Sequence, residues 1–345
     1  MAYGRSTWAA AAFTQTAHWG ELIQGPIPHR GRLITGLITL PRSDRGSTAV
    51  FTPSPGELTV EPNWRLKAEQ AARLVLQKVG SPDLGGTLSI QTNIPSGCGG
   101  GSTTADVTAT IWAVSKAAGL RLTPNQVQRL DWLIEKAADP LALLAVGRAV
   151  VYGSRTGETI RWLNRPLPAM RCLGFNAEPG RTILTEELAS RTEYRPAEQS
   201  AFQGVLDRAT KAIESNDLTS LAQAATDSAR LNQSRLPTRH FEEILKAIRV
   251  AGGAGLAVSH SGTVGAAIFH PGQADVELRI REVADALRAL GCADIGPFGV
   301  CGGPFVKRTT TGVKHLATSP LTNIALTAST GCRAAPRPSV RTART

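Results

Sequence analysis

Apolar residues recur along the chain at two different intervals, and these intervals divide most of it into short strands and helices. Alternating or continuous apolar residues between glycine- and proline-rich turns predict strands. In the first half these are residues 7–18, 32–40, 48–52 and 87–94. Residues 66–79 instead repeat apolar side chains at three- and four-residue intervals, which predicts a helix. The same spacing from Val107 to Val114 predicts a second helix directly after the glycines at 97–101.

Two prolines, Pro166 and Pro168, separate this half from a second one with its own order of elements. A helix at 124–137 and a strand pair turning at 155–157 are expected before them. After them we expect a strand at 170–176, two strands within 253–270 around a turn at 259–262, and a strand near 297–306. Helices are expected at about 198–214, 217–230, 239–251 and 275–290. Strands separated by paired helices predict an α+β architecture with a ferredoxin-like second domain. The predicted division is a first domain at 1–163, a second at 164–318 and a basic disordered tail at 319–345.

The composition is typical of a folded protein of two domains. The chain has 345 residues, 42% of them hydrophobic, and no apolar run approaches the roughly 20 residues that cross a bilayer. The N-terminus has no apolar segment of signal-peptide length, so the predicted location is the cytoplasm. Five cysteines without a CxxC spacing predict scattered reduced thiols rather than a zinc site or a disulfide framework.

The net charge of +11 is concentrated at the C-terminal end. Residues 306–345 contain seven Lys or Arg and no Asp or Glu, which leaves +4 for the rest of the chain. Nucleic-acid-binding surfaces combine clustered basic residues with aromatic side chains, and the folded part lacks that combination. We therefore predict no specific nucleic-acid partner and no membrane partner, whereas a mildly basic body suits a small anionic molecule.

The stretch PSGCGGGSTT at 95–104 places bare backbone at the start of a predicted helix. Glycine lets backbone N–H groups approach a ligand, and the first turn of a helix has free N–H groups and a positive dipole end. This combination favours phosphate, although a tight strand-to-helix turn would also use small residues. A P-loop lysine is absent, and Ser102 stands where a dinucleotide fingerprint has its third glycine. The predicted phosphate-binding residues are Pro95, Gly97, Cys98, Gly99, Gly100, Gly101, Ser102, Thr103 and Thr104.

Three stretches in the expected order resemble the motifs of the GHMP kinases. The glycine stretch resembles the PxxxGLGSSA motif, and GGAGLAVSHSGTVGAAI at 252–268 is similar to the third, C-terminal glycine motif. GELIQG at 20–25 and the residues STTAD after the glycines resemble one branch, the bacterial L-threonine kinases of cobalamin synthesis and propanediol utilisation. The resemblance covers residues 7–306. Trp19, Cys98 and Gly100 depart from it, since the branch usually has Cys, a Lys-like residue and a bulkier Leu or Met there.

The resemblance implies a GHMP fold with an N-terminal domain like ribosomal protein S5 and a C-terminal ferredoxin-like domain. It implies ATP and Mg²⁺ as cofactors and an amino-acid substrate, with L-threonine converted to O-phospho-L-threonine. Homoserine, serine or another small alcohol is the alternative acceptor. A catalytically inactive fold that senses a metabolite is a second alternative, and a homodimer is an open alternative for the assembly.

Carboxylates and hydroxyls in the matched segments are the candidate catalytic groups. Asp139, in EKAADPL, is expected to bind Mg²⁺ or act as the base, although Asp-Pro also commonly ends a helix. Glu135, four residues earlier on the same predicted helix face, is the alternative metal ligand, and Ser102 would add a hydroxyl. Glu21, in a predicted loop, would hold an ammonium group or orient the acceptor hydroxyl, or else be solvated.

Three further residues belong to the predicted site on the strength of the glycine motifs. Thr103 is expected to contribute a catalytic hydroxyl and to form an N-cap pair with Asp106. Ser261 and Gly262, in the third motif, are expected to bind the cofactor. His18 and His260 are expected to face solvent, as histidines near turns commonly do; the alternative is that either one reaches a phosphate or the substrate carboxylate.

Overall fold

A long antiparallel hairpin is the centre of the computed structural model. The structure describes residues 8–81, 83–95, 97, 99–181, 194–301 and 306–307. β1 (Ala11–His29) and β2 (Arg32–Pro55) pair along nearly their whole length. Positive φ angles at Arg30 and Gly31, 49° and 75°, give the tight turn whose twist matches that of the strands. The two strands predicted at 32–40 and 48–52 are therefore one continuous strand.

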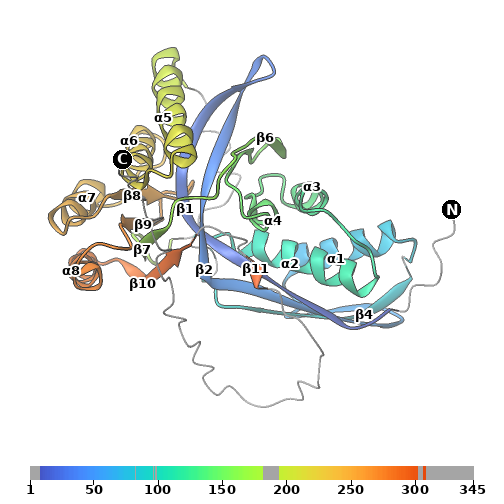
Figure 1. The fold of residues 1–345 in the computed structure, drawn as a ribbon. Helices are drawn as coiled ribbons and strands as arrows, with labels where there is room; N and C mark the ends of the chain where they lie inside the picture. The colour runs from blue at the N-terminus through green and yellow to red at the C-terminus, as the bar shows by residue number, and fades with distance from the viewer. Residues whose placement is uncertain are drawn as a thin grey trace, which may run out of the picture. The chain divides into compact units, whose positions relative to one another are not determined.

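The N-terminal half packs helices against one face of the sheet that this hairpin begins (Figure 1). β2 pairs with β4, and β3 runs parallel to β4. Apolar side chains of α1 and α2, among them Val75 and Ile111, share a core with Phe51 and Leu88 of the sheet. Leu66, the first residue of the apolar repeat that predicted α1, is 63% exposed and lies outside this core. The elements are β3 (Leu58–Glu61), α1 (Leu66–Lys78), β4 (Leu84–Thr92), α2 (Ser102–Ala117), α3 (Pro124–Glu135), α4 (Leu141–Leu144), β5 (Val150–Gly153) and β6 (Glu158–Trp162).

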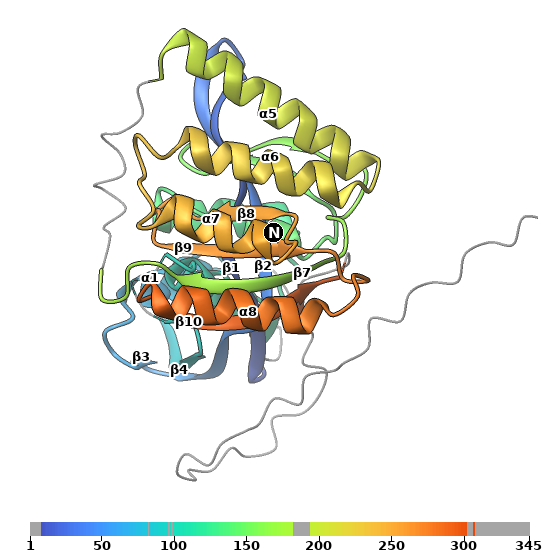
Figure 2. The ribbon, with the colours of Figure 1, turned by 90° about the vertical axis from the view of Figure 1, so that its left-hand side faces the viewer.

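The C-terminal half stacks four helices in front of its strands, as Figure 2 shows. Strong side-chain caps set some of the helix boundaries; Asp217, for example, accepts a hydrogen bond from the Ser220 N–H at the start of α6. The elements are β7 (Met170–Asn176), α5 (Pro196–Glu214), α6 (Leu218–Leu231), α7 (Phe241–Val250), β8 (Gly255–Val258), β9 (Val264–Phe269), α8 (Val276–Ala289), β10 (Ala293–Val300) and β11 (Val306–Lys307). The predicted α+β class and the order of these elements are confirmed.

One 11-stranded sheet connects the two halves. Its main order is β10-β7-β9-β8-β1-β2-β4-β3, and the junction is the antiparallel pairing of β8 with β1, where Val258 lies opposite Glu21. This junction brings the turn after β8 next to the GELIQG segment. The predicted domain boundary at 163 stays a prediction, and the tail at 319–345 lies outside the described residues.

Two further expectations from composition can be compared with the structure. Cys172 and Cys292 are free, as predicted, and both are buried. Cys301 is disulfide-bonded, so the prediction of a reduced thiol is wrong at that position. No helix in the described part of the chain is long and apolar enough to cross a membrane.

Candidate active site

Irregularities in β1 bring His18 and Glu21 to the same interior side of the strand. Residues three apart in a regular strand point to opposite faces, but the register with β2 shifts between His18 and Glu21. Gly20, between them, has a φ of 106°, which a residue with a side chain would adopt only under strain. His18 is 0% exposed and Glu21 2%. The predicted loop at GELIQG is thus a bulged strand, and His18 does not face solvent.

Four residues from distant segments meet in what we call the histidine–carboxylate cluster: His18, Glu21, Asp139 and His260. His18 Nε2 lies 3.0 Å from Asp139 Oδ2, and His18 Nδ1 lies 3.5 Å from Glu21 Oε1. His260, in the turn after β8, places Nδ1 3.8 Å from a carboxylate oxygen of each acid. Asp139 follows the end of α3, where Gln128 Nε2 donates to its backbone carbonyl at 2.9 Å. This hydrogen bond fixes the segment that carries the carboxylate.

Mutual attraction sets the charges of this cluster. Burial alone would lower the pKa of His18, but Asp139 and Glu21 outweigh it and raise that pKa to about 9. Burial alone would raise the pKa of Asp139, but His18 and His260 lower it to about 2. The pKa of His260 is also raised, because the two carboxylates outweigh its burial. At neutral pH His18 is therefore an imidazolium next to an ionised Asp139.

Not every polar atom of the cluster is satisfied within the protein. Thr39 Oγ1 donates to Glu21 Oε2 at 2.6 Å. Among the described residues, Glu21 Oε1 and the ring nitrogens of His18 have no partner with hydrogen-bond geometry. Buried polar groups are nearly always hydrogen-bonded in native proteins, so these atoms, which have only the ion-pair contacts given above, are available to a ligand.

The glycine loop meets the cluster at Gly101, which is the N-cap of α2 with a φ of 70°. A Cβ at this position would stand 2.6 Å from His18 Nε2 and 3.5 Å from Asp139 Oδ2. The N–H of Ala105 bonds to the Gly101 carbonyl, so the N–H groups of the preceding turn are left for a ligand. Free N–H groups, the positive end of α2 and the His18 imidazolium therefore meet at one place, which suits a phosphate.

Hydroxyl groups of the β8–β9 turn touch the other part of the glycine loop. Ser261 Oγ lies 2.7 Å from both Ser259 Oγ and Thr263 Oγ1. A Cβ on Gly99 would stand 3.2 Å from Thr263 Oγ1, so the turn and the loop are in close contact. Gly262 lies close to another backbone segment, since a Cβ at this position would stand 2.8 Å from the carbonyl oxygen of Pro237. Ser261 thus lies beside the predicted phosphate site, whereas Gly262 allows two backbones to approach.

Two other carboxylates, Asp106 and Glu135, are held by permanently charged partners; we call these the basic-residue pairs. Arg65 and Ser47 donate to Asp106, and Lys67 Nζ lies 3.0 Å from Glu135 Oε2. Burial raises the pKa of both acids, and the basic partners offset part of that rise. The predicted cap by Thr103 and Asp106 is therefore wrong, because Asp106 is engaged by β2 and by Arg65.

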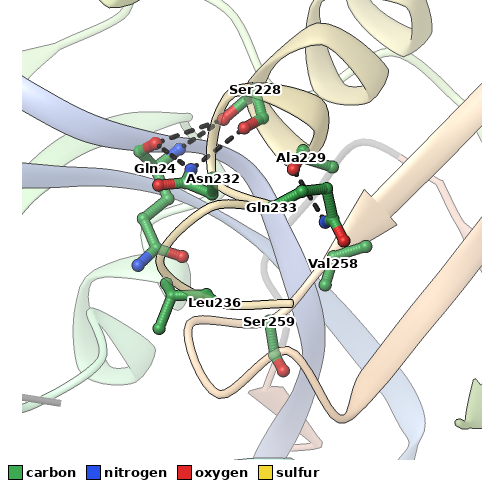
Figure 3. A pocket seen from close by; sticks show the side chains of 8 residues that line it. All are labelled: Gln24, Ser228, Ala229, Asn232, Gln233, Leu236, Val258 and Ser259. Carbon is green, nitrogen blue, oxygen red and sulfur yellow. Dashed lines mark hydrogen bonds between the residues drawn. The ribbon is translucent and has the colours of Figure 1, made fainter. Parts of the chain in front are cut away.

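A small pocket lies between β1, α6 and the turn after β8 (Figure 3). The backbone of Gln24 is fixed there, since its N–H donates to Ser228 Oγ and its carbonyl accepts from Asn232 Nδ2. Its carboxamide extends toward Leu236 (Figure 3) and makes no hydrogen bond to a described residue. The pocket has room for about one water-sized group. It is lined by uncharged residues: Gln24, Ser228, Ala229, Asn232, Gln233, Leu236, Val258 and Ser259.

Two family models match the chain on either side of the predicted boundary. The model of the GHMP kinases N terminal domain matches residues 67–145, which include the glycine loop and Asp139. The model of the GHMP kinases C terminal matches residues 209–289, which include His260 and Ser261. The chain belongs to the GHMP kinase superfamily.

Relatives of this GHMP kinase include mevalonate kinases. Those of Pyrococcus furiosus and Thermococcus gammatolerans are 27% and 26% identical over 318 and 291 residues. These alignments cover 84% and 76% of this chain, and 89% and 81% of the relatives. GHMP kinases are small-molecule phosphotransferases that use ATP with Mg²⁺, so the predicted enzyme class and cofactors are supported.

Solved structures share the fold. A homoserine kinase from Cytophaga hutchinsonii superposes with a TM-score of 0.68 at 14% identity, and L. major mevalonate kinase in complex with R-mevalonate with 0.61 at 16%. Each comparison covers 88% of this chain and 99% of the other. Such identities show the fold alone, and the narrower resemblance to L-threonine kinases stays a hypothesis.

The structure brings some of the predicted site residues together and separates others. Glu21 and Asp139 meet, and Gly99, Gly101 and Ser261 lie beside them. Thr103 is exposed in the first turn of α2, and Cys98 lies outside the described residues. Glu135 ends α3 and Asp139 lies beyond it, so the predicted shared helix face is wrong.

The sequence interpretation considered the two histidines of the cluster but left them out of the predicted site. A period of two places His18 and Glu21 on opposite faces, so only a bulge can join them. The available signal was Gly20, since a glycine inside an apolar strand commonly marks a bulge.

Proposed function

We propose that this GHMP kinase transfers the γ-phosphoryl group of ATP to the hydroxyl of a small carboxylic acid, with the reaction at the histidine–carboxylate cluster. The observation that carries the proposal is the contact of Gly101 with His18 and Asp139. It puts the N-cap of α2, where backbone N–H groups suit phosphate, beside a buried, charged acid–imidazolium pair. A merely structural glycine turn would not need this neighbour.

His18 and Asp139 have complementary roles in this proposal. Phosphoryl transfer spreads negative charge over the γ-phosphate oxygens, and a fixed cation stabilises that charge. The glycine loop contains no lysine, so we assign this role to the His18 imidazolium. Asp139 orients the acceptor hydroxyl and takes its proton as the new O–P bond forms and the bond to the ADP oxygen breaks. Glu21, anchored by Thr39, keeps His18 protonated.

The residues present also fit Mg²⁺, which prefers oxygen ligands. Glu21 has a buried oxygen without a partner, Asp139 is ionised beside it, and Ser102 and Thr103 offer hydroxyls at the start of α2. Glu21, Asp139 and Ser102 would hold the ion, which when bound would neutralise charge on the phosphates. Glu135, engaged by Lys67, is assigned to supporting the fold.

Several acceptors share the proposed chemistry. The GELIQG resemblance points to L-threonine, with L-homoserine and L-serine as alternatives, and the names of the relatives point to mevalonate and homoserine. All are small carboxylic acids with a free hydroxyl. The uncharged pocket lies next to the cluster, because Gln24 follows Glu21 on β1 and Ser259 precedes His260 in the turn after β8. We propose that this pocket takes an uncharged polar group of the acceptor.

A screen of ADP release with L-threonine, L-serine, L-homoserine, mevalonate and galactose tests the proposal. We expect turnover with at least one of the acids and none with galactose, and Asp139→Asn should remove it. Turnover of galactose alone would overturn the acceptor class. ATP binding, measured by calorimetry, without turnover of any acceptor would favour a metabolite sensor instead.

A further inference from the structure

Trp19 fills the space in which a side chain at position 100 would lie. Its indole is 0% exposed. A Cβ on Gly100 would stand 2.9 Å from Trp19 Cζ3 and 3.2 Å from Cε3, closer than carbon atoms pack. Gly99 and Gly101 have φ angles of 83° and 70°, whereas the φ of Gly100 lies outside the left-handed region. The backbone at 100 would therefore accept a side chain, and Trp19 is what excludes it.

The other edge of the same indole is fixed by the C-terminal half. Trp19 Nε1 donates to the carbonyl of Phe175 at the end of β7, at 3.1 Å. The Arg42 guanidinium stacks on the indole at 4.3 Å and lies 5.0 Å from the Phe298 ring of β10. A cation on an aromatic face is attracted to it, more strongly when water is excluded. The indole is thus held from β7 and β10 while its six-membered ring supports the glycine loop.

We propose that Trp19 is a positioning residue for the nucleotide loop and that Trp19 and Gly100 form a matched large–small pair. Consecutive residues of β1 meet consecutive residues of the loop, since Trp19 faces Gly100 and His18 faces Gly101. The tilt of the indole therefore sets the distance between the loop and the His18 imidazolium. This inference rests on the proposed ATP site at the loop.

A double-variant cycle tests the pair. Gly100→Ala adds one methyl group against the indole, and such overpacking should weaken binding of a non-hydrolysable ATP analogue by about tenfold. Trp19→Leu removes the ring atoms that the methyl meets. The double variant should therefore bind the analogue more tightly than Gly100→Ala, so that the two effects are not additive. Trp19→Phe, which retains more of the packing, serves if Trp19→Leu does not fold.

Gly101→Ala is the matched control, because its φ and its contact with His18 do not involve the indole. Trp19→Leu should not rescue it. The KM for ATP should change in Gly100→Ala more than kcat does, which a general loss of stability would not produce. The inference would be overturned if the losses of analogue affinity in the double variant were additive. It would also be overturned if Trp19→Leu rescued Gly101→Ala as well as it rescues Gly100→Ala. Absence of ATP binding in the unsubstituted protein would instead contradict the proposed function.

Discussion

Buried carboxylates occur in two regions near the start of α2, and their partners differ in kind. In the basic-residue pairs, Asp106 and Glu135 are neutralised by Arg65 and Lys67. In the histidine–carboxylate cluster the counter-charge comes from imidazole rings, and several polar atoms have no hydrogen-bond partner among the described residues. A guanidinium stays charged at any physiological pH, whereas imidazole gains and loses its proton there.

We infer that this difference separates the carboxylates that support the fold from those that take part in the reaction. A carboxylate paired with a permanent cation is already neutralised within the protein. These ion pairs hold β2, α1 and α3 around the glycine loop. A carboxylate between two imidazoles is able to exchange partners when a phosphate, an ion or a hydroxyl arrives. We therefore expect the type of partner, rather than the burial that both regions share, to distinguish the reacting carboxylates.

Removal of the His18 charge should lower the rate strongly. His18→Gln keeps a polar side chain but loses the cation beside Gly101, and we expect kcat to fall by about 10²–10³. Arg65→Gln, which removes the cation of a basic-residue pair, is the control and should leave kcat nearly unchanged. Steady-state kinetics of both variants measures this difference. An equal fall of kcat in the two variants would show that the type of partner does not distinguish the two regions.

Closing the space at Gly101 should weaken nucleotide binding. Gly101→Val places a β-branched side chain at a φ of 70° and against His18. The backbone strain should cost about 1–3 kcal/mol. Together with the displacement of His18, this strain should weaken ATP binding about 100-fold. Gly204→Val in α5 is the control, because a Cβ there meets open space. Calorimetry on the folded variants measures both, and unchanged affinity in Gly101→Val would remove the phosphate site from the loop.

The His18 charge should also be visible in the pH dependence of stability, measured without metal or nucleotide. Its folded-state pKa of about 9 exceeds the unfolded value of 6.5, so the stabilisation is fully present below pH 6.5 and is lost as pH rises through 9. The loss should be on the order of 3 kcal/mol. Urea unfolding at pH 6, 7.5 and 9.5 should show this decline in the unsubstituted protein and a clearly smaller one in His18→Gln, which still contains His260, whose pKa the same carboxylates raise; parallel curves would contradict the assigned charge.

Glu135→Gln should have the smallest effect on rate. The variant loses the ion pair with Lys67, which is 43% exposed and therefore free to be solvated. We expect kcat to fall less than about tenfold, since a surface-accessible ion pair contributes little. A loss as large as that of His18→Gln, found by the same ADP-release assay, would return Glu135 to the metal site.

Regular periodicity predicted most of the fold but not the geometry of the site. Helices such as α1, α3 and α8 follow from apolar spacing because each buries one face. The continuous β2 was not predictable, since its polar middle segment pairs with β1 only when the long hairpin forms. The glycine loop was recognisable because its chemistry is local to ten residues.

The cluster depends instead on contacts between distant segments. His18 faces Glu21 only because of the bulge at Gly20, and His260 reaches both acids only because β8 pairs with β1. Asp106 is a case in which local spacing gave the wrong answer. The spacing predicted a helix cap, but in the structure the carboxylate of Asp106 pairs with Arg65 instead. Sequence resemblance selected Glu21 and Asp139, and the structure was needed to supply their histidine partners.

The central claim is that the carboxylate partnered by histidine reacts and the one partnered by arginine supports the fold. Its most direct test is kcat for Asp139→Asn beside kcat for Asp106→Asn, at saturating ATP and acceptor, because each change replaces a buried carboxylate by an amide of the same size. The account predicts that Asp139→Asn lowers kcat by about 10²–10⁴, while Asp106→Asn stays near the unsubstituted rate and loses about 1–3 kcal/mol of unfolding free energy. A retained rate in Asp139→Asn together with a lost rate in a folded Asp106→Asn would contradict it.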